Sequence, residues 1–374
     1  MGTSLKQRIR RLRASGPTAS GPVSSALAER LRRLDPARRR GESVEPADEA
    51  RLAEQLGAEV LAPGVLCLER SRPLTERHGR WRLDGLIPAV PRLLDGVDPD
   101  PAGWVVIDTE TSGLAGGTGT WVFCVGIGRP VAGRLQLRQW LLTRLDAEPA
   151  FLEAVELALA DASVLISYNG KSFDIPLLAT RFRLVGQEPG LDRLDHLDLL
   201  YPVRRAFGSR WPDCRLARVE ERLLHAPRRD DLPGAEAPAA WRAWLRSSDP
   251  SRLGAVLRHN RIDLLSVAAL LPALARVAEA PIELGADIAA MARHALRRRR
   301  PEQALAVLQA GRPELDTPAA LLLAGLLRRR GDWGQAIAIW QALAKQGSPK
   351  AEQALIRYRR QQMIARNGRL FEEE

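Results

Sequence analysis

The 374-residue sequence predicts an α/β domain followed by a smaller all-α domain. Strand-like apolar runs at 104–111, 121–128, 135–142 and 164–168 surround a helical pattern at 148–160. Strands with an intervening helix are typical of α/β domains. After residue 283 the pattern becomes helical throughout, with short amphipathic segments joined by tight turns. We therefore expect a sheet with flanking helices first and a helical domain second.

The strand at 104–111 carries two carboxylates near its end, Asp108 and Glu110. Alternation along a strand places them on one face, about 7 Å apart at their Cα atoms. Two like charges held together on an apolar strand are costly unless a cation lies between them. The pair therefore predicts a divalent-metal site with oxygen ligands. The alternative is an ordinary acidic strand end.

The loop that follows, 112–120, is rich in glycine and includes Gly117 and Thr118. Such a loop can bring backbone amides close to a phosphate, so we count both residues as substrate-binding candidates. A second strand follows instead of a helix, which argues against a Walker or Rossmann phosphate loop. A wide hairpin turn is the alternative interpretation.

The strand at 164–168 leads into a second polar motif with Asn169, Lys171 and Asp174. A helix is expected at 175–185, so Asp174 lies where a helix cap is common, and capping is its alternative role. Asn169 and Lys171 could contact a phosphate or sugar of a substrate. For Lys171 the alternative is a solvated loop charge.

The third motif is His259 and Asp263, within a predicted helix at 252–271. Residues four apart project from one face of a helix. Apolar residues elsewhere on this helix indicate that much of it is buried, which places the His–Asp face near the edge of the core. A surface pair is the alternative.

The three motifs together resemble those of the DEDD exonucleases of the ribonuclease H-like superfamily. Further stretches, at 116–120, 196–200, 214–220, 229–234 and 259–260, resemble its bacterial YprB-like subfamily. The resemblance covers roughly 101–283. It implies a mixed five-stranded sheet flanked by helices and a 3′→5′ exonuclease that acts on nucleic acid. It also implies two Mg²⁺ or Mn²⁺ ions bound by four carboxylates, Asp108, Glu110, Asp174 and Asp263.

In that scheme Asp108 bridges the two ions, Glu110 and Asp263 complete one site, and Asp174 holds the other partly through water. Two metals can activate a water and stabilise the leaving oxygen of a phosphodiester. His259 is the candidate general base, because its ordinary pKa lies close to 7. It lies four residues before Asp263, where the tyrosine branch of the group has tyrosine, while the histidine branch spaces its histidine five residues away. The competing function is therefore a nucleic-acid-binding or adaptor protein with little or no turnover.

Charge and composition outline the rest of the chain. Of the net charge of +11, residues 1–40 contribute +9, from 11 basic and 2 acidic residues. We expect a basic, mostly disordered arm at 1–45, a small helix and hairpin lead-in at 46–100, the exonuclease-like domain at 101–283 and the helical domain at 284–374. Residues 285–374 contribute a further +7, from 16 basic and 9 acidic residues. Basic flanks suit a polyanion such as DNA or RNA, and a general preference for arginine over lysine is the alternative. The expected substrate is a single-stranded end of such a nucleic acid.

The helical domain contains a stretch at 331–337 that resembles the helix-turn of a tetratricopeptide repeat, which suggests a protein partner. Three widely spaced cysteines suit a reducing cytoplasm. No apolar run reaches the length of a membrane span, and no secretory signal is expected.

Four further residues keep two interpretations each. Asp198 lies on a predicted short strand after His196 and could face the site as an auxiliary carboxylate, or serve the core or the surface. Trp211, Trp241 and Trp244 could stack on bases, or belong to the core.

Overall fold

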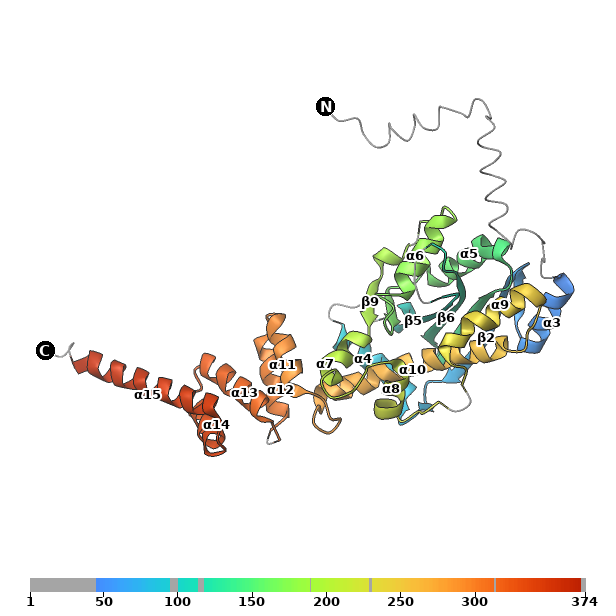
Figure 1. Ribbon diagram of the computed structural model, residues 1–374. Helices are drawn as coiled ribbons and strands as arrows, with labels where there is room; N and C mark the ends of the chain where they lie inside the picture. The colour runs from blue at the N-terminus through green and yellow to red at the C-terminus, as the bar shows by residue number, and fades with distance from the viewer. Residues whose placement is uncertain are drawn as a thin grey trace, which may run out of the picture. The chain divides into compact units, whose positions relative to one another are not determined.

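The computed structural model describes residues 45–94, 100–113, 118–188, 190–228, 231–312 and 314–370, the last seven of these in backbone only (Figure 1). The basic arm expected at 1–45 lies, apart from its final residue, outside the described residues. So do Gly117 of the glycine-rich loop and the pair at 229–230.

The centre of the protein is a seven-stranded mixed sheet in the order β1-β2-β7-β6-β5-β8-β9. Its strands are β1 (Glu59–Ala62), β2 (Val65–Pro73), β5 (Trp104–Thr111), β6 (Val122–Val131), β7 (Arg134–Leu142), β8 (Val164–Ser167) and β9 (Asp195–Asp198). Strands β5, β8 and β9 run parallel to one another, and the other neighbours pair antiparallel. This confirms the expected mixed sheet flanked by helices.

The sheet has two more strands than the five that the resemblance implied. The hairpin of β1 and β2 is the one expected around Pro63–Gly64, and β2 pairs with β7 along nine residues, from Val65 to Pro73. An open edge on β7 would leave a row of backbone donors and acceptors unpaired. Segments from the lead-in therefore extend the same sheet. A separate pair of short strands, β3 (Arg77–His78) and β4 (Trp81–Arg82), follows.

Strand β5 is buried on both faces, because its side chains alternate between two hydrophobic cores, one on each side of the sheet. Val105 and Ile107 pack into one core with α5 (Glu148–Leu159) and α6 (Asp174–Leu184). Trp104 and Val106 pack into the other, with α4 (Leu86–Leu93), α7 (Leu200–Phe207) and α10 (Leu253–Glu279). In Figure 1 the sheet accordingly lies between α5 and α6 on one side and α4 and α10 on the other. The near-continuous apolar run is the pattern expected of a central strand.

Helix α10 approaches the sheet closely at Gly126 of β6, which lies opposite Asp108 in the β5–β6 register. A Cβ atom at Gly126 would lie 2.2 Å from Asn260 Oδ1 and 2.9 Å from Leu264 Cδ1. The missing side chain therefore makes room for Asn260, which is fully buried.

Replacing Gly126 with alanine should destabilise the protein by about 1–3 kcal/mol, because the added methyl overpacks the interface between α10 and the sheet. Chemical denaturation would measure the loss. The control is Gly128→Ala on the same strand, whose Cβ would lie 3.2 Å from Leu137 Cδ2, the end of a side chain, and so should lower the unfolding free energy less. Equal losses for the two variants would contradict this account of the close approach.

The C-terminal region consists of helices that form their own core, as the sequence predicts. They are α11 (Ile288–Arg297), α12 (Pro301–Ala310), α13 (Thr317–Arg329), α14 (Trp333–Lys345) and α15 (Pro349–Leu370). Alanine and leucine fill that core, and Asp316 and Asp332 cap α13 and α14 by accepting hydrogen bonds from Ala319 N and Gln335 N. The resemblance to a tetratricopeptide repeat and the boundary at residue 284 stay predictions. In the part of the chain that the structure describes, no helix combines the length and apolar character needed to cross a membrane.

Candidate functional site

The structure brings the predicted carboxylates to the region where β5 meets α10. Asp108 is the most firmly held of them. Its Oδ2 accepts a hydrogen bond from Asn260 Nδ2 at 2.8 Å, and its backbone oxygen accepts a second at 3.2 Å. The amide oxygen of Asn260 in turn accepts from Gln139 Nε2 at 2.8 Å, and Gln139 also donates to the Leu257 carbonyl at 2.7 Å. A buried amide chain therefore fixes both the α10 backbone and the Asp108 side chain.

Glu110 lies two residues further along β5 and is 8% exposed. Burial raises the pKa of Glu110, and the charges of Asp263 and Asp174 raise it further. Burial also raises the pKa of Asp108, with further increases from Asp263, Asp174 and Glu110. The charges of Asp263 and Asp174 therefore act on both Asp108 and Glu110, so the four predicted ligands belong to one electrostatic cluster.

Asp174 is the first residue of α6 and is also buried. Its Oδ1 accepts a hydrogen bond from Thr109 Oγ1 at 2.5 Å, so a residue of β5 that lies between the two carboxylates of that strand holds it in place. Burial raises the pKa of Asp174 to about 6, although the hydrogen bond from Thr109 opposes the rise. The structure does not give Asp174 the capping role, because Phe173 is the N-cap of α6 and, among the described residues, no side chain caps this helix end. As an acidic residue of the first turn, Asp174 still interacts favourably with the helix dipole when it is ionised.

Asp263 is bound by an arginine that the sequence did not single out. Arg228 donates from Nη2 to Asp263 Oδ1. The same guanidinium binds the fully buried Glu220 through Nε at 2.5 Å and Nη2 at 2.8 Å, and it donates from Nη1 to Asp231 at 2.9 Å. Arg228 therefore joins three carboxylates from three separate segments.

Little in the sequence signals this arginine. Glu220 and Asp231 lie in stretches that carry the resemblance, at 214–220 and 229–234, but Arg228 lies between those stretches. Glu220 opens a single π-helical turn, Glu220–Leu224, and such turns are frequent at functional sites. Neither the turn nor the pairing follows from local spacing.

His259 joins the same cluster. Its Nδ1 lies 2.7 Å from Asp231 Oδ2, and its Nε2 lies 3.9 Å from Asp263 Oδ2. A carboxylate can only accept, so the contact with Asp231 requires a proton on Nδ1 and leaves the lone pair on Nε2. Arg228 Nη1 lies 3.0 Å from Nδ1 and 3.4 Å from Nε2, and in this tautomer only Nε2 can accept from it. The surface-pair alternative does not apply, because His259 and Asp263 are only 13% and 15% exposed.

Asp198 serves the core, which was one of its two predicted roles. It is 3% exposed and accepts hydrogen bonds from three backbone N–H groups, those of Asn169 at 2.8 Å, Lys171 at 3.0 Å and Leu200 at 3.0 Å. It thereby shapes the turn after β8, in which Asn169 has a φ of +69°. The side chains of Asn169 and Lys171 are exposed on this turn. Their contact with substrate stays a prediction.

The remaining candidate residues, in the glycine-rich loop and among the tryptophans, lie in different surroundings. The carbonyl of Thr118 accepts a hydrogen bond from Arg181 Nη1 at 3.0 Å, which ties down the end of the glycine-rich loop. Trp241 and Trp244 are buried and donate to the carbonyls of Leu142 and Thr143, so they belong to the core. Trp211 is half-buried and lines a cavity considered below.

The donor set suits hard divalent cations, which prefer carboxylate oxygens. However, among the described residues no three acidic, histidine or cysteine side chains already form a metal-binding group. Asp263 is turned onto Arg228 and Asp174 onto Thr109. The residues present therefore fit such ions in chemistry, and binding requires these two side chains to reorient.

The raised pKa of Asp174 gives a test on the metal-free protein. A carboxyl group with a folded-state pKa of about 6, above its ordinary 3.8, destabilises the fold when it ionises. The resulting loss of unfolding free energy is small near pH 4, grows as the pH rises towards 6, and reaches its full value above pH 6. Asp174→Asn keeps an oxygen that can accept from Thr109 and carries no charge. In EDTA, its gain in unfolding free energy should be about 2 kcal/mol larger at pH 8 than at pH 4.5.

Denaturant titrations at the two pH values measure this difference. Asp192→Asn, at an exposed aspartate, is the control and should give the same result at both. A gain for Asp174→Asn that is independent of pH would contradict a buried, charged Asp174.

Comparison with known proteins places this geometry in context. Residues 105–275 match the protein-family model described as RNase_H superfamily. The chain is 28% identical over 307 residues to the uncharacterized protein YprB of Bacillus subtilis (strain 168), and this match covers 78% of the chain and 74% of that protein. Among solved structures, the family B DNA polymerase of the hyperthermophilic archaeon Pyrobaculum calidifontis matches with a TM-score of 0.37 and 16% identity. That match covers 71% of this chain but 36% of the polymerase, and its TM-score is too low to support an argument.

Proposed function

We propose that the protein is a metal-dependent nuclease that removes nucleotides from the 3′ ends of single-stranded DNA or RNA. The match of residues 105–275 to the RNase_H superfamily model supports this proposal. The nuclease class is supported by that match. The 3′→5′ polarity rests on the resemblance of the three carboxylate motifs to the DEDD exonucleases. The three cysteines are free thiols, which suits a cytoplasmic location.

The observation that carries the proposal is the unbalanced charge of the site. Glu220, Asp231 and Asp263 pair with the Arg228 guanidinium, whose charge also acts on Glu110. Asp108 and Asp174 belong to the same cluster through Asp263 and Glu110, and Arg228 is the guanidinium that the described residues place among these six carboxylates. Six carboxylates and one guanidinium leave a formal charge of −5 when all are ionised. An apolar surrounding does not tolerate such a charge, so it either protonates the carboxylates or attracts cations. Two divalent cations, Mg²⁺ or Mn²⁺, would reduce it to −1.

Asp108, Glu110, Asp174 and Asp263 are the residues that would hold these ions. When bound, such ions lower the pKa of an attacking water and stabilise charge on the leaving oxygen of a phosphodiester. Asn260 already orients the Asp108 carboxylate through its 2.8 Å hydrogen bond, so Asp108 would need little reorganisation to hold an ion. Asp263 would have to leave Arg228 to do so, and Arg228 would keep its bidentate contact with Glu220.

His259 has the position of a general base. Its Nδ1 is held by Asp231, and its Nε2 faces the Asp263 side of the cluster. The tyrosine-type spacing therefore still delivers an imidazole to the carboxylate centre, because a partner from another loop orients the ring. We assign His259 Nε2 the role of accepting the proton of the attacking water, for which it would have to exchange its 3.4 Å contact with Arg228 Nη1 for the water.

A second function is favoured by one observation. Since Arg228 already pairs with Asp263, the chain could keep the carboxylates as a nucleic-acid-binding or adaptor protein without turnover. Exposed arginines and the basic flanks suit that role as well, and the helical C-terminal region would then bind a protein partner. Activity assays separate the two functions.

The direct test uses 5′-labelled DNA and RNA oligonucleotides with Mg²⁺ or Mn²⁺. The parent protein should produce a ladder of products shortened from the 3′ end, and EDTA should stop it. Asp108→Asn should lower the rate by about 10³-fold or more, because a metal ligand supplies several kcal/mol of transition-state stabilisation. Asp161→Asn, at an exposed aspartate outside the cluster, is the matched control. Full activity in Asp108→Asn would contradict the metal centre, and no activity in the parent on any substrate would favour the adaptor function.

The role of His259 is tested in single-turnover experiments. His259→Ala should lower the rate by about 10²–10⁴-fold at neutral pH, with the Mn²⁺ affinity nearly unchanged, since the four carboxylates remain. Asp231→Asn should lower the rate by a smaller factor, because the imidazole remains but loses its fixed orientation. If His259→Ala and the parent react at equal rates from pH 6 to 9, the bound ions alone activate the water and His259 is structural.

A further inference from the structure

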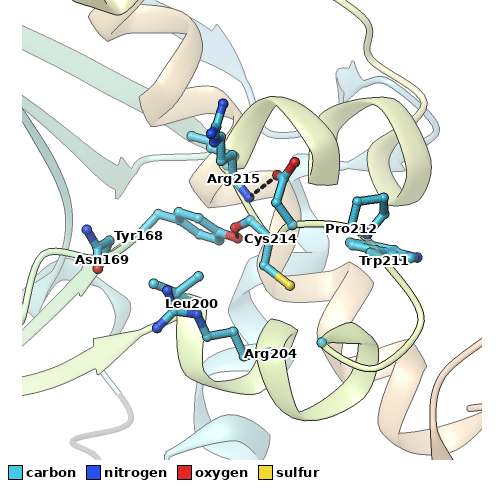
Figure 2. Close-up of a pocket in the computed structure, with 11 residues that line it drawn as sticks. Tyr168, Asn169, Leu200, Arg204, Trp211, Pro212, Cys214 and Arg215 are labelled. Carbon is cyan, nitrogen blue, oxygen red and sulfur yellow. Dashed lines mark hydrogen bonds between the residues drawn. The ribbon is translucent and has the colours of Figure 1, made fainter.

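A cavity of about 660 Å³ lies beside the turn that follows β8. Figure 2 shows Tyr168 and Asn169 on one side of it and Trp211 and Pro212 on the other, with Arg204, Cys214 and Arg215 between. Its size falls within the range of small-ligand sites, about 300–1,000 Å³. Asn169 is a predicted substrate contact, and no role has been assigned above to the rest of this cavity.

The cavity adjoins the carboxylate centre. Strands β5, β8 and β9 are parallel neighbours, so their C-terminal ends lie on one edge of the sheet. Glu110 lies near the end of β5, and Asn169 follows β8. Gly170 connects the two regions directly, because a Cβ atom built on it would lie 3.6 Å from Asp174 Oδ2. The cavity, which Asn169 lines, therefore lies at the same edge of the sheet as the carboxylates and next to the turn that contacts Asp174.

Two arginines of the cavity wall have no ion-pair partner in the part of the chain that the structure describes. Arg204 and Arg215 are exposed, and no ion pair of either guanidinium occurs among the residues that the structure describes. Burial raises the pKa of the Cys214 thiol, and the nearby Arg204 charge opposes the rise. The acidic lining residue, Asp213, is already engaged, since it accepts from Arg215 N at 2.9 Å and lies 4.0 Å from Arg218.

Two aromatic rings are held rigid around the same space. Trp211 stacks on Phe207, with ring centroids 4.1 Å apart and planes within 8° of parallel. The Tyr168 hydroxyl donates to the carbonyl of Cys214 at 2.5 Å, which connects the β8 turn to the opposite wall. Rigid aromatic rings and unpaired guanidinium groups are the combination that binds single-stranded nucleic acid, through its bases and phosphates respectively.

We propose that this cavity binds an unpaired nucleotide of a single-stranded nucleic acid, adjacent to the nucleotide being removed. Arg204 and Arg215 contact its phosphates, and Trp211 and Tyr168 contact its base. A base-paired nucleotide is excluded, because its base is stacked and paired within the duplex and cannot enter a cavity of this size. The proposal rests on the proposed nuclease function for the direction of the strand, and the cavity's own chemistry supports the binding.

The binding test uses full-length protein carrying Asp108→Asn, so that substrate is not consumed. Fluorescence anisotropy measures its affinity for a labelled single-stranded decamer, as DNA and as RNA, and for the same decamer in a duplex. Adding Arg204→Gln and Arg215→Gln should weaken single-strand binding about 10–100-fold, which is the usual effect of losing one or two charge-assisted contacts. The log–log salt slope should fall by about 1.4, since each single-strand phosphate contact contributes about 0.7.

The matched control removes two arginines elsewhere, with Arg51→Gln and Arg246→Gln, and should leave both quantities nearly unchanged. Equal weakening by the two pairs of substitutions would overturn the proposal, because net charge alone would then explain binding. The proposal would also be overturned if Arg204→Gln and Arg215→Gln together, the cavity pair, lowered the affinity for the duplex as much as the affinity for the single strand.

Turnover separates the cavity from the metal centre. In protein with the native Asp108, the cavity pair should lower kcat/KM for the decamer and leave the hydrolysis of thymidine 5′-(p-nitrophenyl phosphate) unchanged, because that compound is too short to reach the cavity. A parallel fall for both substrates would overturn the subsite. If the parent hydrolyses neither substrate, the nuclease function fails, while the anisotropy result still decides whether the cavity binds single strands.

Discussion

The structure depends on placing like-charged carboxylates between β5 and α10 without losing the packing around them. Asp108, Glu110, Asp174 and Asp263 all have raised pKa values, and burial is the largest cause for each. Such an arrangement stores electrostatic repulsion that the rest of the fold must offset. The neighbouring contacts are therefore arranged to hold these four side chains, and many of them come from segments distant in sequence.

Two supports hold the centre from opposite sides. On the sheet side, the Gln139–Asn260–Asp108 chain fixes α10 against β6, and Gly126 leaves the space for it. On the other side, the π-helical turn presents Glu220 to Arg228, and Ser266 Oγ donates to Glu220 Oε1 at 2.5 Å. The short β3–β4 hairpin completes this support. His78 lies 2.9 Å from Ser266 Oγ, and a Cβ atom at Gly79 would lie 2.0 Å from the Leu224 carbonyl oxygen. The lead-in segment therefore supports the carboxylate centre indirectly, through its contacts with Ser266 and with the π-helical turn.

The sequence predicts the features that local patterns determine. Alternation on β5 places Asp108 and Glu110 together, and helical spacing places His259 beside Asp263, as the structure shows. The sequence does not predict Arg228, because its partners Glu220 and Asp263 lie eight and 35 residues away and meet only after α10 has packed. The edge pairing of β2 with β7 and the backbone-binding role of Asp198 are likewise tertiary. The tryptophans show the same limit, since Trp241 packs in the core and Trp211 lines a cavity, and local sequence does not decide between stacking and core roles for either.

The central claim is that the buried carboxylates form a centre for two divalent cations, and a crystal structure of the protein in millimolar Mn²⁺ tests it most directly. Anomalous scattering at the manganese edge locates the ions independently of any activity. The account predicts two peaks, both bound by Asp108, with Asp263 turned from Arg228 towards one of them and Arg228 still on Glu220. An absence of peaks, with the Asp263–Arg228 pair intact at saturating Mn²⁺, would contradict it.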